Sequence, residues 1–367
     1  MAARSGASRL TKKDRVVVVL GAGATKACGG PLTGEILPRA FQPAQKLGLA
    51  KLEEFLMQQF GLPKGKRSDD DYPQLPLLLS LLDTAIDREH GFGGKWTVES
   101  LRSVRKEAEY AVFKAIAEAL RRSRGSGPEL HEQLFHWIWR TTGEQPIVIS
   151  LNYDLLADQA LIAMEGGGFP DYACQIDTNG YTEAHRWGKL LKIHGSMNWI
   201  YCGACDRLEI GIDKHGETFK IALSLARTMV ESSHDLQQYY QERAAKCPRC
   251  DGAFRPVMIT PTHLKDYRNP HIAALWYRAE RELQDCTRVI FIGYSLPWDD
   301  VDVIYLLKRG LLRKSGASPA ITVVEHADRK VPIDQHDAGR RYRAVFGRNI
   351  DWQPIGFQKW LQQVAVH

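Results

Sequence analysis

Short apolar runs that alternate with segments of helical period constrain the fold of this chain most strongly. The first run, residues 15–20, is rich in β-branched residues and ends at a glycine, which is typical of a buried strand in a parallel sheet. Similar runs lie at 146–150, 190–193, 257–259, 289–292 and 321–324, and helical segments follow several of them, at 155–163, 270–283 and 300–313. This alternation predicts an α/β fold with a doubly wound parallel sheet.

A long stretch with the pattern of helices, and without strand-like runs, separates the first two expected strands. Residues from about 35 to 140 are mixed in polarity and mostly of helical period, as at 101–120, with breaks expected at 61–63 and 125–128. We interpret this stretch as a helical insertion into the α/β domain. A short amphipathic helix is expected near the end of the chain, at 357–364.

Composition adds limits on the class of protein. The chain has 367 residues, of which 44% are hydrophobic, and this is enough for one large domain with a sizeable core. The net charge is only +6, and most basic residues fall on expected helices, which favours solvated helix faces over a polyanion-binding surface. Because residues 1–14 lack the apolar core of a signal peptide and no apolar run is long enough for a membrane span, we expect a flexible N-terminus, one domain over 15–367 and a cytoplasmic protein that does not contact membranes.

Four of the seven cysteines form two tight pairs. Cys202 and Cys205 make one Cys-x-x-Cys pair, and Cys247 and Cys250 make the other. Each pair can occupy one edge of a tetrahedron, which is the ligand arrangement of structural zinc, whereas a redox dithiol would leave the second pair unexplained. The sequence therefore predicts a small zinc-binding module of four cysteines over about 200–258. It includes an apparent helix at 219–242 whose purpose does not follow from the sequence.

A glycine-rich turn follows the first expected strand. Gly21 and Gly23 allow a tight turn, the N–H groups of the next helix would favour a pyrophosphate, and Thr25 adds a hydroxyl. Tight turns also use this pattern without a ligand. The third glycine of the hydride-transfer fingerprint is absent, since Lys26 occupies its position, so the sequence does not match that class of dinucleotide site.

Polar residues follow other expected strands at the edge where parallel sheets bind ligands. Asn152 and Asp154 come after the run at 146–150, although Asn152 would equally suit a helix cap. His194 follows 190–193, and the unperturbed pKa of a histidine suits a general base, although any one of 12 histidines is more often structural. Gly293 and Ser295 follow 289–292, where Ser295 and Asp299 are also candidate caps of the next helix. Glu325 ends the last expected strand, as acidic residues that hold a ribose often do.

Taken in order, these fragments resemble the Sir2 (sirtuin-like) family. The matching fragments are Gly21-Ala22-Gly23-Ala24-Thr25, Asn152-Tyr153-Asp154, His194-Gly195, the two cysteine pairs and Gly293-Tyr294-Ser295-Leu296-Pro297. The resemblance covers 15–31, 146–200, 202–260 and 288–326, and leaves the helical insertion outside. It implies a Rossmann-like domain that binds NAD and breaks its nicotinamide–ribose bond, with a structural zinc ion that does no chemistry.

The resemblance also implies residue roles. Asn152 would contact the nicotinamide ribose and place the nucleophile, Asp154 would hold the carboxamide, and His194 would be the general base. The remaining NAD contacts would come from Gly21, Ala22, Gly23, Thr25, Gly293 and Ser295, with Glu325 expected at the adenosine ribose hydroxyls.

Two departures from the protein-deacylating sirtuins argue against a peptide substrate. Leu32-Thr33-Gly34 stands where those enzymes carry Asp-Phe-Arg, and residues 259–265 replace the Phe-Gly-Glu segment that docks the acyl-lysine peptide. The fragment Gly-Tyr-Ser-Leu-Pro, followed by an acidic residue, is similar to sirtuin-like proteins of bacterial defence systems.

The expected function is therefore an NAD hydrolase that releases nicotinamide and ADP-ribose in antiviral defence by NAD depletion. Its activity would be gated by a protein partner or a homo-oligomer, with the helical insertion as the gating surface, and a nucleic acid would act only indirectly. The alternatives are an NAD-dependent protein deacylase and a non-catalytic sensor of NAD or ADP-ribose.

Overall fold

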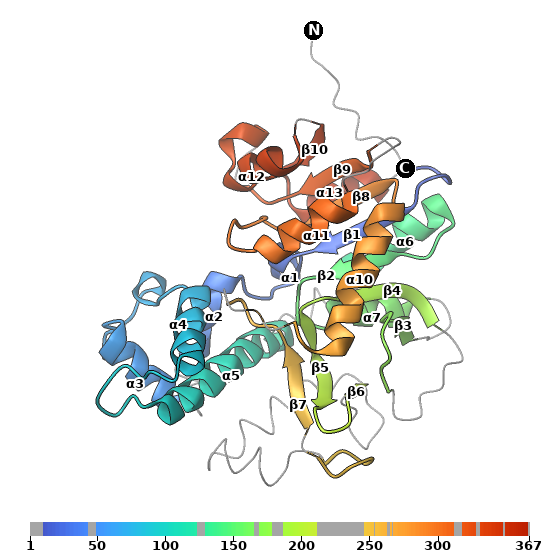
Figure 1. The fold of residues 1–367 in the computed structure, drawn as a ribbon. Helices are drawn as coiled ribbons and strands as arrows, with labels where there is room; N and C mark the ends of the chain where they lie inside the picture. Colours follow the sequence, from blue (N-terminus) through green and yellow to red (C-terminus); the bar gives the residue numbers. More distant parts are fainter. Residues whose placement is uncertain are drawn as a thin grey trace.

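The structure is a computed structural model that describes residues 10–42, 49–122, 129–164, 169–177, 186–210, 246–252, 254–262, 265, 267–311, 318–327, 331–347 and 349–365 (Figure 1). The helix expected at 219–242 and the break expected at 125–128 lie outside these residues. Of the expected N-terminal tail, Leu10 is buried and Asp14 accepts a hydrogen bond from Thr287, so both residues contact the domain.

A parallel sheet forms the centre of the molecule (Figure 1). Its seven strands lie in the order β10-β9-β8-β1-β2-β4-β3, and every neighbouring pair is parallel. The order reverses beside β1, because β2, β4 and β3 lie on one side of this strand and β8, β9 and β10 lie on the other. The doubly wound α/β prediction is confirmed. The strands are β1 (Val16–Leu20), β2 (Ile147–Ser150), β3 (Phe169–Asp171), β4 (Arg186–Lys192), β8 (Arg288–Ile292), β9 (Ala320–Val324) and β10 (Ile350–Gln353).

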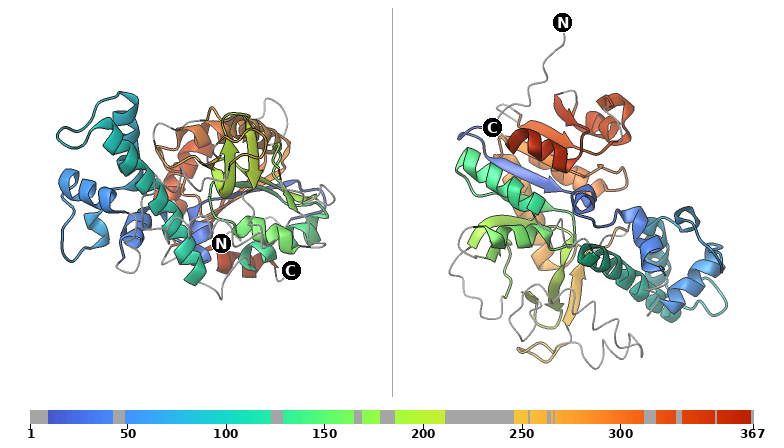
Figure 2. Two further views of the ribbon diagram at one scale, coloured as in Figure 1. Left: turned by 90° about the horizontal axis from the view of Figure 1, so that it is seen from below. Right: turned by 180° about the vertical axis from the view of Figure 1, so that it is seen from behind.

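Helices cover both faces of this sheet, which explains why its central strands are apolar throughout. All five residues of β1 and of β8 are buried. One face carries α6 (Glu129–Thr142), α7 (Leu156–Ala163) and α13 (Phe357–Ala365), and the other carries α10 (Pro270–Asp285) and α11 (Val301–Leu311) (Figures 1 and 2). The remaining elements near the sheet are α1 (Ala22–Ala27), η4 (Ile333–Gln335) and α12 (Asp337–Phe346).

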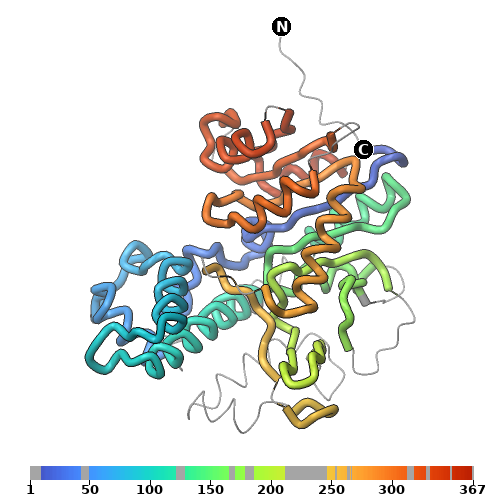
Figure 3. Tube along the Cα trace, in the orientation of Figure 1, coloured from blue at the N-terminus to red at the C-terminus, as the bar shows by residue number. Residues whose placement is uncertain are grey.

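The stretch of chain between β1 and α6 forms a helical arm, which projects from one side of the sheet (Figure 3). It has a hydrophobic core of its own, which includes Leu52, Phe55, Leu78 and Val104. Helix α6 lies inside the range expected for the insertion, but it packs with the core of the sheet. The arm consists of η1 (Thr33–Glu35), α2 (Ile36–Ala40), α3 (Ala50–Gln59), η3 (Asp69–Asp71), α4 (Leu75–Asp87) and α5 (Val98–Arg122).

One expected strand of the parallel sheet is wrong. The run 257–259 lies at the end of β7 (Phe254–Met258), which pairs antiparallel with β5 (Gly195–Cys202) in a separate small sheet completed by β6 (Arg207–Ile210). Strand β7 is only partly buried, since Phe254 and Val257 are buried, Pro256 and Met258 are half-buried and Arg255 is exposed. Three apolar residues could not distinguish this half-buried strand from a central one.

No helix among the described residues combines the length and apolar character that crossing a membrane requires.

Candidate active site and cysteine cluster

A cavity of about 570 Å³ opens at the carboxyl ends of β1, β2, β4, β8 and β9, beside the point where the strand order reverses. This is the edge at which doubly wound sheets bind ligands. Helical-arm residues Gln74, Pro76 and Ile116 form part of its wall. The cavity brings together all ten residues that the sequence predicts for catalysis and NAD binding: Gly21, Ala22, Gly23, Thr25, Asn152, Asp154, His194, Gly293, Ser295 and Glu325.

The glycine turns after β1 and β8 touch each other through their backbones. The amide of Gly23 donates to the carbonyl of Gly293 at 2.7 Å. A Cβ at either Gly21 or Gly23 would lie 2.6 Å from backbone atoms of residues 293–294, and Gly293 itself has a φ of +62°. These glycines are therefore required by a close backbone crossing, with or without a ligand.

Asn152 and Asp154 tie the loop after β2 to the turn after β1. The Asn152 side-chain amide donates to the Gly21 carbonyl at 2.9 Å, and the Thr25 hydroxyl donates to the Asp154 carboxylate at 2.5 Å. The amide of Leu156, at the start of α7, donates to the other Asp154 oxygen at 2.9 Å. The capping interpretation therefore fits Asp154, whereas Asn152 contacts the neighbouring turn and lines the cavity.

His194 presents an unpartnered nitrogen at the cavity. The residue is 7% exposed, and its Nε2 is buried with no hydrogen-bond partner among the described residues. Burial lowers the pKa of His194 to about 4, opposed by the nearby Asp300 carboxylate and assisted by the Lys265 ammonium. The imidazole is therefore neutral at pH 7, with a nitrogen that can accept a proton from a group in the cavity.

Glu325 supplies a second unpartnered group. Its Oε1 is buried without a hydrogen-bond partner in the described part of the chain, and its backbone is held by Gln353 and Gly356. Burial raises the pKa of Glu325 to about 7, with Arg341 acting in the opposite direction. Arg341, on α12, also donates to the Ser295 carbonyl at 2.9 Å, which ties α12 to the loop after β8.

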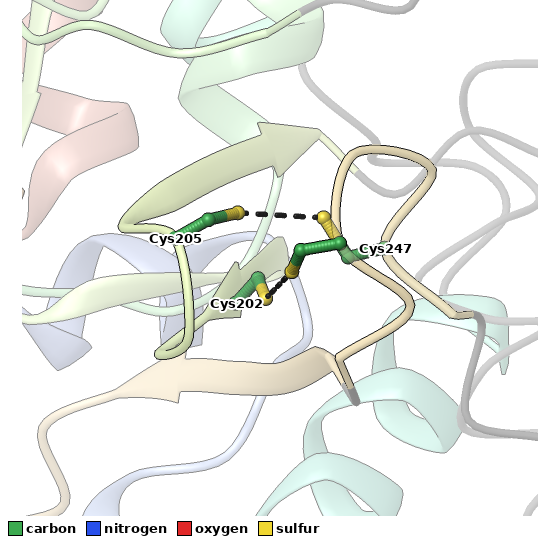
Figure 4. A group of neighbouring side chains, drawn as sticks. Cys202, Cys205 and Cys247 are labelled. Atoms are coloured by element: carbon green, nitrogen blue, oxygen red, sulfur yellow. Dashed lines mark hydrogen bonds between the residues drawn. The ribbon is translucent and has the colours of Figure 1, made fainter.

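The four paired cysteines meet at the far end of the small sheet. Their Sγ atoms all lie within 4.8 Å of one another, at 3.5 Å between Cys202 and Cys250 and 3.6 Å between Cys205 and Cys247 (Figure 4). Zn–S bonds of about 2.3 Å in a tetrahedron place the sulfurs about 3.8 Å apart, whereas a disulfide bond is about 2.05 Å long. The cluster therefore fits a single tetrahedral metal ion.

Strand β5 separates this cluster from the cavity. Gly195, next to His194, begins the strand opposite Met258, and Cys202 ends it opposite Phe254. The four steps of β7 between these two partners span about 13 Å at about 3.3 Å per residue. A metal ion held by the four thiolates would have no open coordination position and no contact with the cavity. Its role would be to hold the small sheet together.

Comparison with known families agrees with this arrangement. A family model described as a SIR2-like domain matches residues 146–346, more than half of the chain. The chain belongs to the SIR2-like family. No curated protein sequence matches this SIR2-like protein.

Solved structures of sirtuins are similar to this SIR2-like protein over nearly its whole length. "Structure of Sir2Tm bound to a propionylated peptide" is 12% identical with a TM-score of 0.43, covering 97% of this chain and 94% of the other. "Sir2-p53 peptide-NAD+" is 13% identical with a TM-score of 0.42, covering 96% and 92%. "Structural Basis for the Mechanism and Regulation of Sir2 Enzymes" is 15% identical with a TM-score of 0.42, covering 97% and 92%.

The cavity of this SIR2-like protein also contains charged residues that the sequence analysis missed. Lys265 forms an ion pair with Asp300, and the Tyr294 hydroxyl donates to the other Asp300 oxygen at 2.7 Å. Both charged side chains are nearly buried. The acidic pair after Gly-Tyr-Ser-Leu-Pro was visible in the sequence, but nothing in it placed Lys265 opposite Asp300.

We expect Thr25→Val to lower the free energy of unfolding by about 2 kcal/mol, because it leaves a buried Asp154 oxygen without its hydroxyl donor. Thr25→Ser keeps the hydroxyl and is the matched control. Urea denaturation of both variants measures the difference. Equal stability of the valine and serine variants would contradict the assigned hydrogen bond.

Proposed function

We propose that this SIR2-like protein is an NAD hydrolase that converts NAD and water into nicotinamide and ADP-ribose. The observation that carries the proposal is the meeting of Asn152, His194 and the two glycine turns at one cavity on the carboxyl edge of the sheet. The resemblance to sirtuins supplies the substrate, and the geometry of the cavity supplies the groups that would act on it.

The reaction needs few protein groups. The C1′–N bond breaks and its electron pair leaves with nicotinamide, which is a good leaving group because the bound pyridinium is cationic. Asn152 would orient the ribose and Asp154 the carboxamide, so that the oxocarbenium-like sugar is held away from bulk water. Water then adds to C1′ and loses its proton to the unpartnered nitrogen of His194. A weak base is sufficient for this step, since the electrophile is highly reactive.

The segment after β7 supports hydrolysis over protein deacylation. A peptide that docks as an added strand needs a free backbone edge. The Ile259 amide donates to the His194 carbonyl at 2.8 Å, and the Tyr153 hydroxyl donates to the Ile259 carbonyl at 2.5 Å. Arg105 of α5 donates to the Thr260 hydroxyl at 2.6 Å. These contacts engage the segment internally and join it to the helical arm.

The same contacts support gating through the helical arm. Residues of α4 and α5 form part of the cavity wall, and Arg105 links α5 to the segment beside His194. A protein partner or a second copy that moves the arm would change the cavity directly. Gated NAD depletion suits a role in bacterial antiviral defence, with the enzyme acting in the cytoplasm where NAD is abundant. A zinc ion, held by the four cysteines, would be structural.

The test uses radiolabelled NAD at high enzyme concentration, so that a basal rate is detected, and follows nicotinamide and ADP-ribose by chromatography. We expect release from NAD alone, with Asn152→Ala reducing it at least about 100-fold through loss of ribose positioning. Release that requires an acetyl-lysine peptide and consumes it stoichiometrically would support a deacylase instead. Tight NAD binding without any cleavage would support the sensor alternative.

A further inference from the structure

A fully buried ion pair lies directly behind the candidate site. Lys192 is 0% exposed and Asp158 is 1% exposed. The Lys192 ammonium donates to the Asp158 carboxylate at 2.9 Å and to the main-chain carbonyl of Asp154 at 2.5 Å. The Tyr172 hydroxyl donates to the second Asp158 oxygen at 2.5 Å.

A gain in the stability of the fold does not explain why these two charges are buried together. Removing two charges from water is costly, and apolar residues of similar volume usually replace a buried ion pair without loss of stability. What an apolar side chain could not do at this position is hold the carbonyl of Asp154. The ammonium has three donors, and two of them are used on the described acceptors.

The position of Lys192 connects the two loops that carry the candidate catalytic groups. Lys192 is the last residue of β4, two positions before His194, and it lies opposite Ser150, the last residue of β2. The loop after β2 carries Asn152 and turns back so that the Asp154 carbonyl meets the ammonium.

A third strand end is joined to these two through the same loop. The carboxylate of Asp154 accepts from Thr25 after β1, and Asn152 donates to Gly21. The strand ends of β1, β2 and β4 are therefore linked through one loop and one buried cation.

We propose that Lys192 is a positioning residue that fixes the loop of Asn152 against the strand end of His194. This inference rests on the proposed function, in which both groups act on the nicotinamide ribose. Loss of the ammonium would release the Asp154 carbonyl and let the distance between Asn152 and His194 vary. Errors of about 1 Å in such a distance can reduce a rate by about 100-fold.

The decisive variant replaces both charges with apolar groups of similar size, Lys192→Met together with Asp158→Leu. We expect kcat for nicotinamide release to fall about 100-fold, while the Kd for NAD changes less than about threefold, because the glycine turns that contact the rest of NAD are untouched. The matched control is Tyr172→Phe. It removes a hydrogen bond to the same carboxylate but leaves the contact between Lys192 and Asp154, so kcat should stay within about twofold of the wild type.

A second double variant, with polar but uncharged side chains, tests whether a neutral donor can restore the activity. Lys192→Gln with Asp158→Asn removes the charges but keeps an amide donor near the Asp154 carbonyl, and we expect its kcat to lie within about tenfold of the wild type. This variant also keeps the test open should the apolar pair not fold.

A readout that does not depend on turnover separates this inference from the proposed function. Amide hydrogen exchange at residues 152–156 should be at least about tenfold faster in the apolar pair and unchanged in Tyr172→Phe. A wild type that cleaves no NAD would overturn the proposed function, and exchange would then decide the role of Lys192. A folded apolar pair with wild-type kcat or wild-type exchange would overturn the inference, as would an equal loss of kcat in Tyr172→Phe.

Discussion

His194→Ala is expected to reduce nicotinamide release from NAD by about 10³-fold, within the range of a lost general base. The variant removes the unpartnered nitrogen of a residue that lines the cavity, while the glycine turns and Asn152 remain. NAD affinity should therefore change little, and isothermal titration beside the chromatographic assay measures both quantities. His131→Asn is the matched control, because His131 is also buried with its pKa lowered to about 4, but it contacts Cys28 and does not line the cavity.

The pH dependence of kcat gives a second test of the same assignment. A free histidine loses its basic form as the pH falls through about 6.5, whereas His194 stays neutral down to about pH 4 because burial penalises its charged form. The rate attributed to this base should stay level from pH 8 to about 5 and fall below that. An acid limb centred at 6.5 in single-turnover rates would contradict the buried, neutral state of His194.

The same pKa shift predicts the effect of acid on stability, with a definite sign. The folded pKa of about 4 lies below the ordinary value of 6.5, so between these values the unfolded chain binds more protons than the folded one. The contribution of His194 is therefore complete above pH 6.5 and is lost as the pH falls toward 4. It amounts to about 3 kcal/mol, and the loss should be absent from His194→Ala, as measured by denaturation of both proteins across this range.

The sequence predicted the sheet well because its central strands are buried on both faces. This is why ten residues spread from Gly21 to Glu325 could be placed at one cavity without knowledge of the strand order.

The parts that the sequence did not predict depend on contacts between distant segments. Strand β7 was assigned to the wrong sheet because the apolar run 257–259 carries no information about the strand that pairs with it, β5. The pairing of Lys265 with Asp300, and of Lys192 with the Asp154 carbonyl, follows from the meeting of loops and strand ends from different parts of the chain. Periodicity describes the face of an element, and it cannot identify which buried charge lies across from another.

Cys247→Ser is expected to have the largest effect on stability, because the small sheet has little else to hold its far end. Among the residues that the structure describes, the hydrophobic cluster there has three buried members, Cys202, Cys247 and Phe254, and the first two belong to the cysteine cluster itself. Trp199, Leu208 and Ile210 of β5 and β6 pack with the core of the parallel sheet, but the small cluster cannot by itself offset the entropy of ordering the two turns that carry the cysteines. Binding of a metal to four thiolates can, since it contributes folding free energy directly.

We therefore expect the wild type to carry one zinc equivalent and Cys247→Ser to carry none, with the free energy of unfolding lowered by on the order of 5 kcal/mol. Elemental analysis and thermal denaturation measure the two effects, and Cys174→Ser, outside the cluster, is the matched control.

Strand β5 leads directly back to His194, and the amide of Ile259, after β7, donates to the His194 carbonyl. Loss of the metal should therefore also disorder the cavity and lower NAD cleavage. A metal-free wild type with full stability would contradict the metal site. A mass lower by four hydrogens would show instead that the four cysteines form two disulfide bonds, as redox dithiols would.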